Sequence, residues 1–554
     1  MYVSAQNLLP TVWQISFADT TKSSKVQFES HDWQRVNMYL SWERQGFSGM
    51  FGKCCFTTSF QIPLGYNREK YSLKLGLHCD VSEVYINNIL VCRNLPNNFW
   101  RDKHSSSTFA IPNSCLRAGK DNRIEIFASG LSYTGGKSYN TCSLTPNNNA
   151  KQESVKIDIP KKDHLFNIGE KDIVLRIKYA SLTTGLLTLC INNDFHDTIL
   201  TKTYTVNPKD NLLKINVSRE LTKCGFYECT ATMHSAGYSC CTQWLALSPE
   251  KITCKTDTTI AHTEYWRDAL NELKSIAPNF KIHKVDSLST GIRDGYVVEM
   301  QSMGNLTIRG YYFVPRTAGK HAVVMQVPGY GYGFQNLASF INSTENVAEL
   351  ALCVRGHGIS ADVFNPGFGI PGIWGYKLNS KTDNAYRSIY MDCVRAVEFL
   401  TSRQEIDSTR IGVMGGSQGG GLTLATAGLC GNKIAACAYF DPFPCDQRDV
   451  LKIRTICNFE LKSYLRYYNN PCSFEEALAI QDLIDSKDMA ARIKCPVFFA
   501  TGLFDDDCPP HIGFSAYNNI HAQKQFKIYP NDSHLGESNH EKEFWEFFKH
   551  QLNF

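Results

Sequence analysis

The sequence of 554 residues lacks any run of 18 or more apolar residues, which argues against a helix that spans a membrane. It also lacks a basic run. Because the formal net charge of +4 is spread along the chain, nucleic acid is not expected as a partner. No two of the 21 cysteines stand at the CxxC spacing of a zinc site. Their high, odd number leaves open both disulfides in an exported protein and thiols in a reducing compartment.

The N-terminus lacks a complete signal peptide, although Met1 to Gln6 resembles the small-residue tail of one. Two expectations about the compartment therefore stay open. The protein is either exported, periplasmic or extracellular, with a truncated signal, or it is cytoplasmic.

A chain of this length suggests about three domains. Short strands between Gly, Pro and Asn predict an all-β sandwich over 1–145, and alternating apolar residues predict an immunoglobulin-like β-sandwich over 146–255. From 256 to 554, apolar strands alternate with amphipathic helices, including a helix predicted from Asp392 to Arg403. This alternation predicts an α/β domain with a mostly parallel sheet and helices on both faces.

The stretch 410–422 contains a strand, a glycine-rich turn and a helix of small residues, with Ser417 at the turn. A serine that stands clear of a sheet takes a strained conformation, so the positions two before and two after it must lack bulk. Gly415 and Gly419 meet this need. The pattern predicts a nucleophile elbow, with the N–H of Gln418 as an oxyanion donor.

Acid and histidine candidates follow the serine in the order found in α/β-hydrolases. Three aspartates, 505–507, come after a buried strand, and spacing alone does not choose among them; a divalent-ion site is the rival interpretation. His534 lies on the loop after the last strand, where the catalytic base is expected. Upstream, the glycine-rich loop at Tyr330 is predicted to supply a second oxyanion N–H. His357 precedes the serine and is predicted to shape a loop.

His540 is the rival for the role of base, because Glu541 follows it. However, it stands at the entrance to the C-terminal helix among acidic and basic residues. This setting is typical of a solvated helix start, where acidic residues are expected from the helix dipole alone. Position on the loop after the last strand therefore favours His534.

Four motifs of the C-terminal half resemble the acetyl xylan esterase and cephalosporin C deacetylase family, carbohydrate esterase family seven. They are Gly415 to Gly421, Arg355-Gly356, Gly502-Leu503-Phe504-Asp505 with Cys508-Pro509-Pro510, and Ala516-Tyr517-Asn518. The resemblance covers about Ala261 to Phe554. Two motifs depart from the family pattern: Arg-Gly-Gln reads Arg355-Gly356-His357, and His-Glu reads His534-Leu535.

The resemblance implies specific roles for these residues. Ser417 is then the nucleophile, Asp505 the triad acid and His534 the base, with the N–H groups of Tyr330 and Gln418 as the oxyanion hole. It also implies removal of acetyl groups from sugars with no cofactor. No metal is expected, because no further acidic cluster lies near the three aspartates in the sequence. Family members often form closed hexamers, so assembly into a homo-oligomer is one expectation for this chain.

The N-terminal region resembles the galactose-binding-like jelly-roll domain in three phrases: 39–42, 56–63 and 80–87. That family sometimes binds sugar and sometimes only braces a neighbouring domain. Trp42, Phe99 and Trp100 are candidate sugar-stacking platforms, although aromatic residues at strand spacing also belong to cores.

The sequence therefore predicts a serine carboxylic-ester hydrolase that removes acetyl groups from acetylated sugars or xylan through a Ser-His-Asp triad and an acyl-enzyme. Its expected partner is an acetylated carbohydrate. A serine peptidase of the prolyl-oligopeptidase type is the enzymatic alternative, and an inactive carbohydrate-binding protein is the non-enzymatic one.

Overall fold

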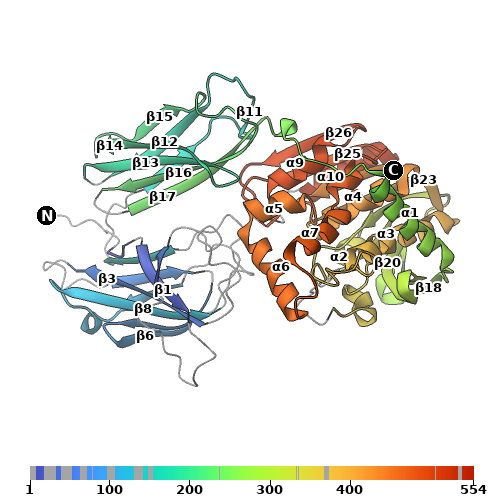
Figure 1. Ribbon diagram of the computed structural model, residues 1–554, viewed down its shortest axis with the longest axis horizontal. Helices are drawn as coiled ribbons and strands as arrows, with labels where there is room; N and C mark the ends of the chain where they lie inside the picture. The colour runs from blue at the N-terminus through green and yellow to red at the C-terminus, as the bar shows by residue number, and fades with distance from the viewer. Residues whose placement is uncertain are drawn as a thin grey trace. The chain divides into compact units, whose positions relative to one another are not determined.

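The computed structural model describes residues 8–10, 12–17, 33–38, 53–62, 71–77, 79–95, 107–129, 141–146, 154–181, 183–235, 238–331, 333–334, 336–366, 373–505, 507–534 and 540–554. The main boundary between its two compact units lies between Leu247 and Ser248. As Figure 1 shows, the N-terminal unit is built of strands, and the C-terminal unit combines strands with helices.

The first β-sandwich has a six-stranded antiparallel sheet, β2-β1-β3-β8-β5-β6, and a three-stranded antiparallel sheet, β7-β4-β9. Its strands are β1 (Val12–Phe17), β2 (Gln34–Asn37), β3 (Lys53–Gln61), β4 (Tyr71–Gly76), β5 (Asp80–Ile86), β6 (Ile89–Leu95), β7 (Ser107–Ile111), β8 (Asp121–Ser129) and β9 (Thr141–Pro146). Alternate residues of each sheet, such as Phe56 of β3 and Leu73 of β4, point into one shared core.

The second β-sandwich has a three-stranded sheet, β10-β12-β15, and a five-stranded sheet, β11-β17-β16-β13-β14. Its strands are β10 (Ser154–Asp158), β11 (Leu165–Phe166), β12 (Val174–Ala180), β13 (Gly185–Asn193), β14 (Thr198–Val206), β15 (Leu212–Asn216), β16 (Gly225–His234) and β17 (Tyr238–Leu247). Apolar residues of both sheets, among them Ile177 and Leu189, again form one core.

The C-terminal unit is organised around a nine-stranded sheet, β18-β19-β20-β22-β21-β23-β24-β25-β26. The strands are β18 (Lys281–Lys284), β19 (Arg293–Gln301), β20 (Thr307–Pro315), β21 (His321–Gln326), β22 (Ala348–Cys353), β23 (Ile406–Gly416), β24 (Ala436–Phe440), β25 (Val497–Gly502) and β26 (Lys524–Tyr529). The pairings from β18 to β22 are antiparallel, and all pairings from β22 to β26 are parallel.

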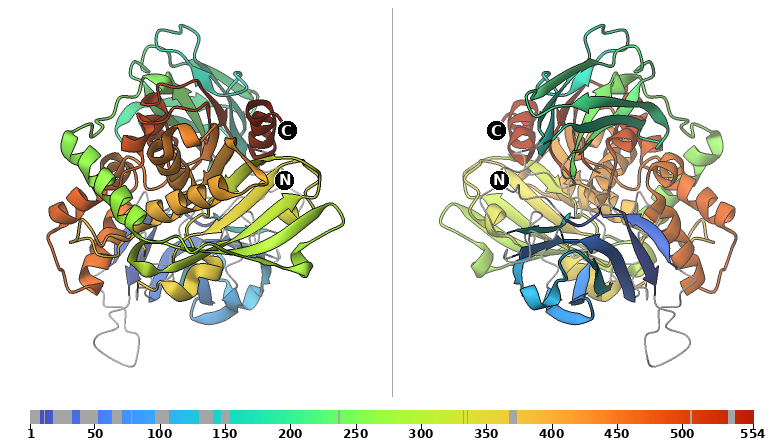
Figure 2. Two further views of the ribbon diagram at one scale, coloured as in Figure 1. Left: turned by 90° about the vertical axis from the view of Figure 1, so that its right-hand side faces the viewer. Right: turned by 90° about the vertical axis from the view of Figure 1, so that its left-hand side faces the viewer.

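Helices cover both faces of this sheet, as Figure 2 shows. Every residue of β24 is buried: Ala438 joins the aromatic residues of α10, and its neighbour Tyr439 stacks on Phe499 towards α9 on the other face. The helices are α1 (Ile260–Ser275), α2 (Ala338–Ile341), α3 (Ala385–Ser402), α4 (Gln418–Cys430), α5 (Gln447–Ile453), α6 (Thr455–Tyr467), α7 (Phe474–Leu483), α8 (Lys487–Ala490), α9 (Pro510–Asn518) and α10 (His540–Leu552).

The parallel strands place the candidate site. Because parallel strands end at the same edge of a sheet, the loops after them lie next to each other in space. Tyr330 follows β21, Ser417 follows β23, Asp441 follows β24, Asp505 follows β25 and His534 follows β26. Side chains more than a hundred residues apart in the chain therefore meet at one edge.

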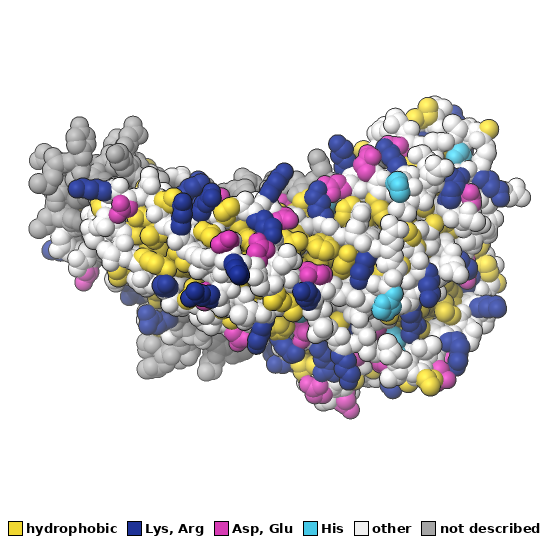
Figure 3. All heavy atoms as spheres, turned by 90° about the horizontal axis from the view of Figure 1, so that it is seen from above, with side chains coloured by type: hydrophobic (Ala, Val, Ile, Leu, Met, Phe, Trp, Pro, Cys, Tyr) yellow, Lys and Arg dark blue, Asp and Glu magenta, His cyan; other side chains and the backbone are white. Residues whose placement is uncertain are grey.

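The predicted fold class, two β-sandwiches followed by an α/β-hydrolase, is confirmed. The helix predicted from Asp392 begins earlier, at Ala385, because the side chain of Asn384 accepts a hydrogen bond from Tyr386 N and caps it there. The cysteines whose side chains the structure describes are free thiols. No helix of the described residues is long and apolar enough to cross a bilayer. On the face drawn in Figure 3, basic and acidic side chains are interspersed.

Candidate active site

Ser417 occupies a sharp turn between β23 and α4. Its backbone has φ 57° and ψ −124°, a strained conformation for a residue with a side chain. A Cβ at Gly415 would lie 2.6 Å from the backbone of Gly419, and one at Gly419 would lie 2.5 Å from Val327 O. Ser417 N also donates to Phe440 O at 3.0 Å. The two glycines therefore let strand, turn and helix approach closely enough to form the elbow.

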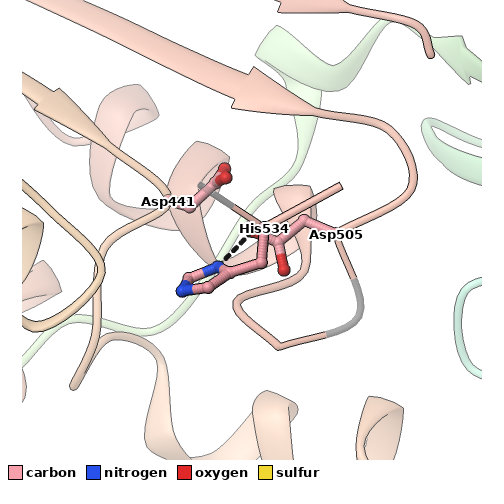
Figure 4. Close-up of side chains that lie close together, drawn as sticks. All are labelled: Asp441, Asp505 and His534. Carbon is pink, nitrogen blue, oxygen red and sulfur yellow. Dashed lines mark hydrogen bonds and ion pairs between the residues drawn. The ribbon is translucent and has the colours of Figure 1, made fainter. Parts of the chain in front are cut away.

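Asp505 and His534 form a hydrogen-bonded pair at the ends of β25 and β26. His534 Nδ1 lies 2.7 Å from Asp505 Oδ2, as the dashed line in Figure 4 shows. The other carboxylate oxygen accepts hydrogen bonds from the N–H groups of Asp507 and Cys508, both at 2.8 Å. Because a carboxylate only accepts, Nδ1 carries the proton, and this tautomer leaves Nε2 as the basic nitrogen.

The loop after Asp505 also reaches the serine. Ser417 Oγ lies 4.0 Å from Cys508 Sγ, and no hydrogen bond joins Ser417 to His534 among the described residues. His534 Nε2 lies 3.5 Å from Asp507 Oδ2. The structure thus brings Asp505 and His534 into contact and links Ser417 to the same loop through Cys508. Asp506 lies outside the described residues.

Gln418 joins the elbow to the glycine-rich loop that carries Tyr330. Its Nε2 donates to Pro328 O at 3.3 Å and to Gly329 O at 3.4 Å, and its Oε1 accepts from Tyr386 Oη at 2.9 Å. Its main-chain N–H begins α4, where a helix offers no carbonyl partner. The side chain of Gln418 therefore positions both predicted oxyanion donors.

His357 supports the same network, in agreement with its predicted place in a loop. It is buried, its Nδ1 lies 3.2 Å from Arg355 O, and its Nε2 lies 3.0 Å from Gln418 Nε2. Nδ1–H therefore donates to the carbonyl, and Nε2 accepts from the amide. Burial lowers the pKa of His357, which keeps the ring neutral as this pattern requires.

Asp441 is a site residue that the sequence reasoning missed. It is buried at the end of β24, and its carboxylate lies within 4.8 Å of the nearest donor atoms of Asp505 and His534, as Figure 4 illustrates. Burial, followed by the negative charge of Asp505, raises the pKa of Asp441 well above its ordinary value. Its position directly after an entirely apolar strand was the one signal in the sequence that could have found it.

Two groups of side chains have donors close enough to suggest a metal ion. In the group of Asp441, Asp505 and His534, the 2.7 Å separation of Nδ1 and Oδ2 fits a shared proton, whereas two ligands of one metal lie farther apart. In the group of Asp446, Asp449 and His511, the ammonium of Lys487 already lies 3.9 Å from Asp446 Oδ1.

His540 lies in surroundings different from those predicted. Its ring stacks on Phe440, with centroids 4.2 Å apart and planes at 15°, and meets the edge of Phe544 at 5.7 Å. The predicted helix start is confirmed, because α10 begins at His540 with Glu541 and Glu543 in its first turn. The predicted solvated setting of the imidazole is wrong, because the ring packs on these aromatic residues. Trp42, Phe99 and Trp100, the predicted sugar-stacking residues, lie outside the described residues.

The sheet, the strained elbow and the paired acid and histidine define an α/β-hydrolase of the serine type. The family model described as acetyl xylan esterase (AXE1) matches residues 251–552. The chain belongs to the acetyl xylan esterase family, as its motifs indicated, and it is a serine acetyl esterase.

Two related esterases agree with this assignment. The acetyl esterase Axe7A of Xylanibacter ruminicola is 29% identical over 313 residues, which cover 54% of this chain and 70% of that protein. The structure of an acetyl xylan esterase from Paenibacillus sp. R4 is 27% identical, with a TM-score of 0.51 over 55% of this chain and 98% of that one. The acylamino-acid-releasing enzyme of Arabidopsis thaliana is 29% identical over 154 residues, only 19% of its length.

Proposed function

We propose that this esterase removes acetyl groups from acetylated sugars or xylan, with Ser417 as nucleophile, His534 as base and Asp505 as the acid that orients the base. The observation that carries the proposal is the 2.7 Å hydrogen bond between Asp505 and His534, at the sheet edge where the elbow presents Ser417. The names of the related esterases support the acetyl group and the carbohydrate.

In the first step, Ser417 Oγ attacks the acetyl carbonyl carbon while His534 Nε2 takes the hydroxyl proton. The carbonyl π pair moves to oxygen and forms a tetrahedral anion. Asp505 stabilises the imidazolium through Nδ1–H and does not itself take the proton. The anion lies where the N–H groups of Gln418 and Tyr330 can donate to it.

Collapse of this anion re-forms the carbonyl and breaks the bond to the sugar oxygen, which leaves as an alcohol with the proton from His534. The acetyl group is now an ester of Ser417. A water molecule then attacks this ester and gives its proton to the same nitrogen of His534. Acetate leaves, the proton returns to Ser417, and the enzyme is restored.

The test is hydrolysis of p-nitrophenyl esters and of an acetylated xylo-oligosaccharide by the native protein and by Ser417→Ala. We expect the variant to lose turnover on all of them. Each added methylene that the site rejects costs about 1 to 3 kcal/mol, so efficiency should fall from acetate to butyrate to octanoate. Full activity of a folded Ser417→Ala protein, or a preference for octanoate, would contradict the proposal.

A peptidase remains the enzymatic rival, because one relative of short overlap is an acylamino-acid-releasing enzyme. A proline-containing peptide substrate in the same assay separates the two activities. Hydrolysis of the peptide at a rate above that of the acetyl ester would favour the rival.

We further propose that catalysis belongs to residues 256–554 and that the regions 1–145 and 146–255 are accessory. Every proposed catalytic residue lies in the last of these ranges. A protein that begins near Lys255 should therefore keep its turnover of p-nitrophenyl acetate if it folds. A loss of activity confined to polymeric substrate would indicate that an accessory region binds carbohydrate.

A further inference from the structure

A cavity of about 310 Å³ lies in the C-terminal unit between two short walls. One wall is Gly375 to Asn379, and the other runs from Leu465, near the end of α6, to Pro471. The walls are joined beyond the cavity by the thiol of Cys472, which donates to Leu378 O at 3.6 Å. None of the proposed catalytic residues lines this cavity.

The cavity nevertheless begins next to the proposed oxyanion loop. The hydroxyl of Tyr330 accepts a hydrogen bond from Trp374 N at 3.2 Å and lies 3.5 Å from the hydroxyl of Tyr464. Trp374 and Tyr464 directly precede Gly375 and Leu465, the first residues of the two walls. The side chain of Tyr330 therefore links the residues that precede both walls to the proposed oxyanion loop.

Among the described residues that line the cavity, two are aromatic, Tyr376 and Tyr468, and one is a cation, Lys377. The rings of Tyr376 and Tyr468 meet edge to face, 6.4 Å apart at 85°, and Phe364 holds Tyr376 from another side at 5.0 Å. Half-buried tyrosines offer an apolar face and a polar hydroxyl, the combination that a sugar ring with its C–H face and hydroxyl groups requires.

Lys377 distinguishes this cavity from a neutral sugar platform. Its side chain is exposed, its ammonium lies 6.0 Å from the ring centroid of Tyr376, and no carboxylate pairs with it among the described residues. Its backbone has φ 54°, a conformation that costs energy in a residue other than glycine and is kept where the surroundings hold it. An exposed ammonium, with no carboxylate partner among the described residues, thus lies beside the ring of Tyr376.

We propose that this cavity is a substrate subsite for a sugar residue that carries a carboxylate, in a chain whose acetylated residue lies at Ser417. The pyranose ring packs on Tyr376 and Tyr468, and the carboxylate pairs with Lys377. This inference rests on the proposed function and adds a preference for acidic acetylated oligosaccharides. The exposed Asn379 lines the same cavity and adds an amide for the sugar hydroxyl groups.

The test compares three substrates: p-nitrophenyl acetate, a neutral acetylated xylo-oligosaccharide, and one of the same length with a uronic acid residue. The variant is Lys377→Met, which keeps the stem and removes the charge. Lys433→Met is the matched control, because Lys433 is also exposed and has no carboxylate partner among the described residues.

We expect native enzyme to prefer the acidic oligosaccharide. Lys377→Met should raise KM for the acidic oligosaccharide about ten-fold, as for loss of a hydrogen bond to a charged group. The KM values for the other two substrates should not change. Added salt should reduce the preference. Lys433→Met should behave as native. Tyr376→Ala should raise KM for both oligosaccharides and leave KM for p-nitrophenyl acetate unchanged.

Equal KM values of Lys377→Met and Lys433→Met on the acidic substrate, or no native preference for it, would overturn the subsite. Failure of the proposed function is recognised separately, because it appears as Ser417-independent turnover of p-nitrophenyl acetate.

Discussion

The protonation state of Asp441 can be tested by a single isosteric change. Its carboxyl is buried and lies beside the carboxylate of Asp505. A buried carboxylate beside a second negative charge is costly, so the group is expected to hold its proton at neutral pH. The raised pKa agrees. Asp441→Asn then replaces one neutral group by another of the same shape, and fold and turnover should be retained.

The magnitude follows from proton linkage. Between the ordinary carboxyl pKa of about 4 and the raised pKa of Asp441, the native state holds one proton more than the unfolded state. The free energy of unfolding of the native protein therefore falls with rising pH by about 1.4 kcal/mol per unit on account of this proton. The Asn variant lacks this contribution. The stability difference, variant minus native, should rise by about 1.4 kcal/mol per pH unit across that window.

Native-state hydrogen exchange of the β24 and β25 amides measures this difference, because it reports on the C-terminal unit alone. Buried acids that do not interact with Asp441 contribute equally to both proteins and cancel. A difference that stays constant from pH 4 to pH 8 would refute the reasoning, because it means that Asp441 is charged in the native state.

The pH profile of kcat/KM provides an independent check. The ionisable groups that face Asp441 are Asp505 and His534, within 4.8 Å, and Asp507 faces the same imidazole. If Asp441 is neutral, the acid limbs of native and Asp441→Asn profiles coincide. If it is charged, the substitution removes a negative charge beside His534, and the limb moves to lower pH.

Three further experiments test the site and the residues that support it. His534→Ala should lower kcat by at least about 10³-fold, whereas His540→Ala should keep kcat and lower Tm through lost stacking; the opposite result would exchange the two roles. Asp392→Ala leaves the buried guanidinium of Arg355 without its bidentate partner. It should lower the free energy of unfolding, measured by hydrogen exchange, by about 3 to 5 kcal/mol. Gly419→Ala should reduce kcat/KM about 10²-fold by displacing the loop after β21, whereas Gly291→Ala, in open space, should be neutral in the same assay.

The sequence could predict the fold class and the elements that carry the candidate site, because these are encoded by local patterns. The apolar pattern that marks a strand or a helix is visible within about ten residues. The glycines around Ser417 are required by the turn itself. The order of Ser417, Asp505 and His534 along the chain is likewise a linear property. Their catalytic roles remain predictions, although Asp505 and His534 do meet.

The contacts that the sequence could not predict join residues with no local signal. The side chain of Gln418 bonds to the loop at Gly329 and meets His357, and Asp441 approaches Asp505 from 64 positions away (505 − 441). Such pairs depend on the order of strands in the sheet, which the residues of one strand do not encode. The surroundings of His540 were mispredicted for the same reason, because its partner Phe440 is 100 positions earlier (540 − 440).

Strand order also explains why acids far from Ser417 surround the proposed base. Ser417 follows β23 and His534 follows β26, with β24 and β25 between them. Neighbouring strands lie about 4.8 Å apart, so three pairings separate the two loops by about 14 Å at the sheet edge. The loop after β26 must therefore cross the ends of β25 and β24 before its imidazole can serve the serine. Asp505 and Asp441 are the carboxyl groups that it meets there, and for this reason the ends of these two strands determine the electrostatic surroundings of His534.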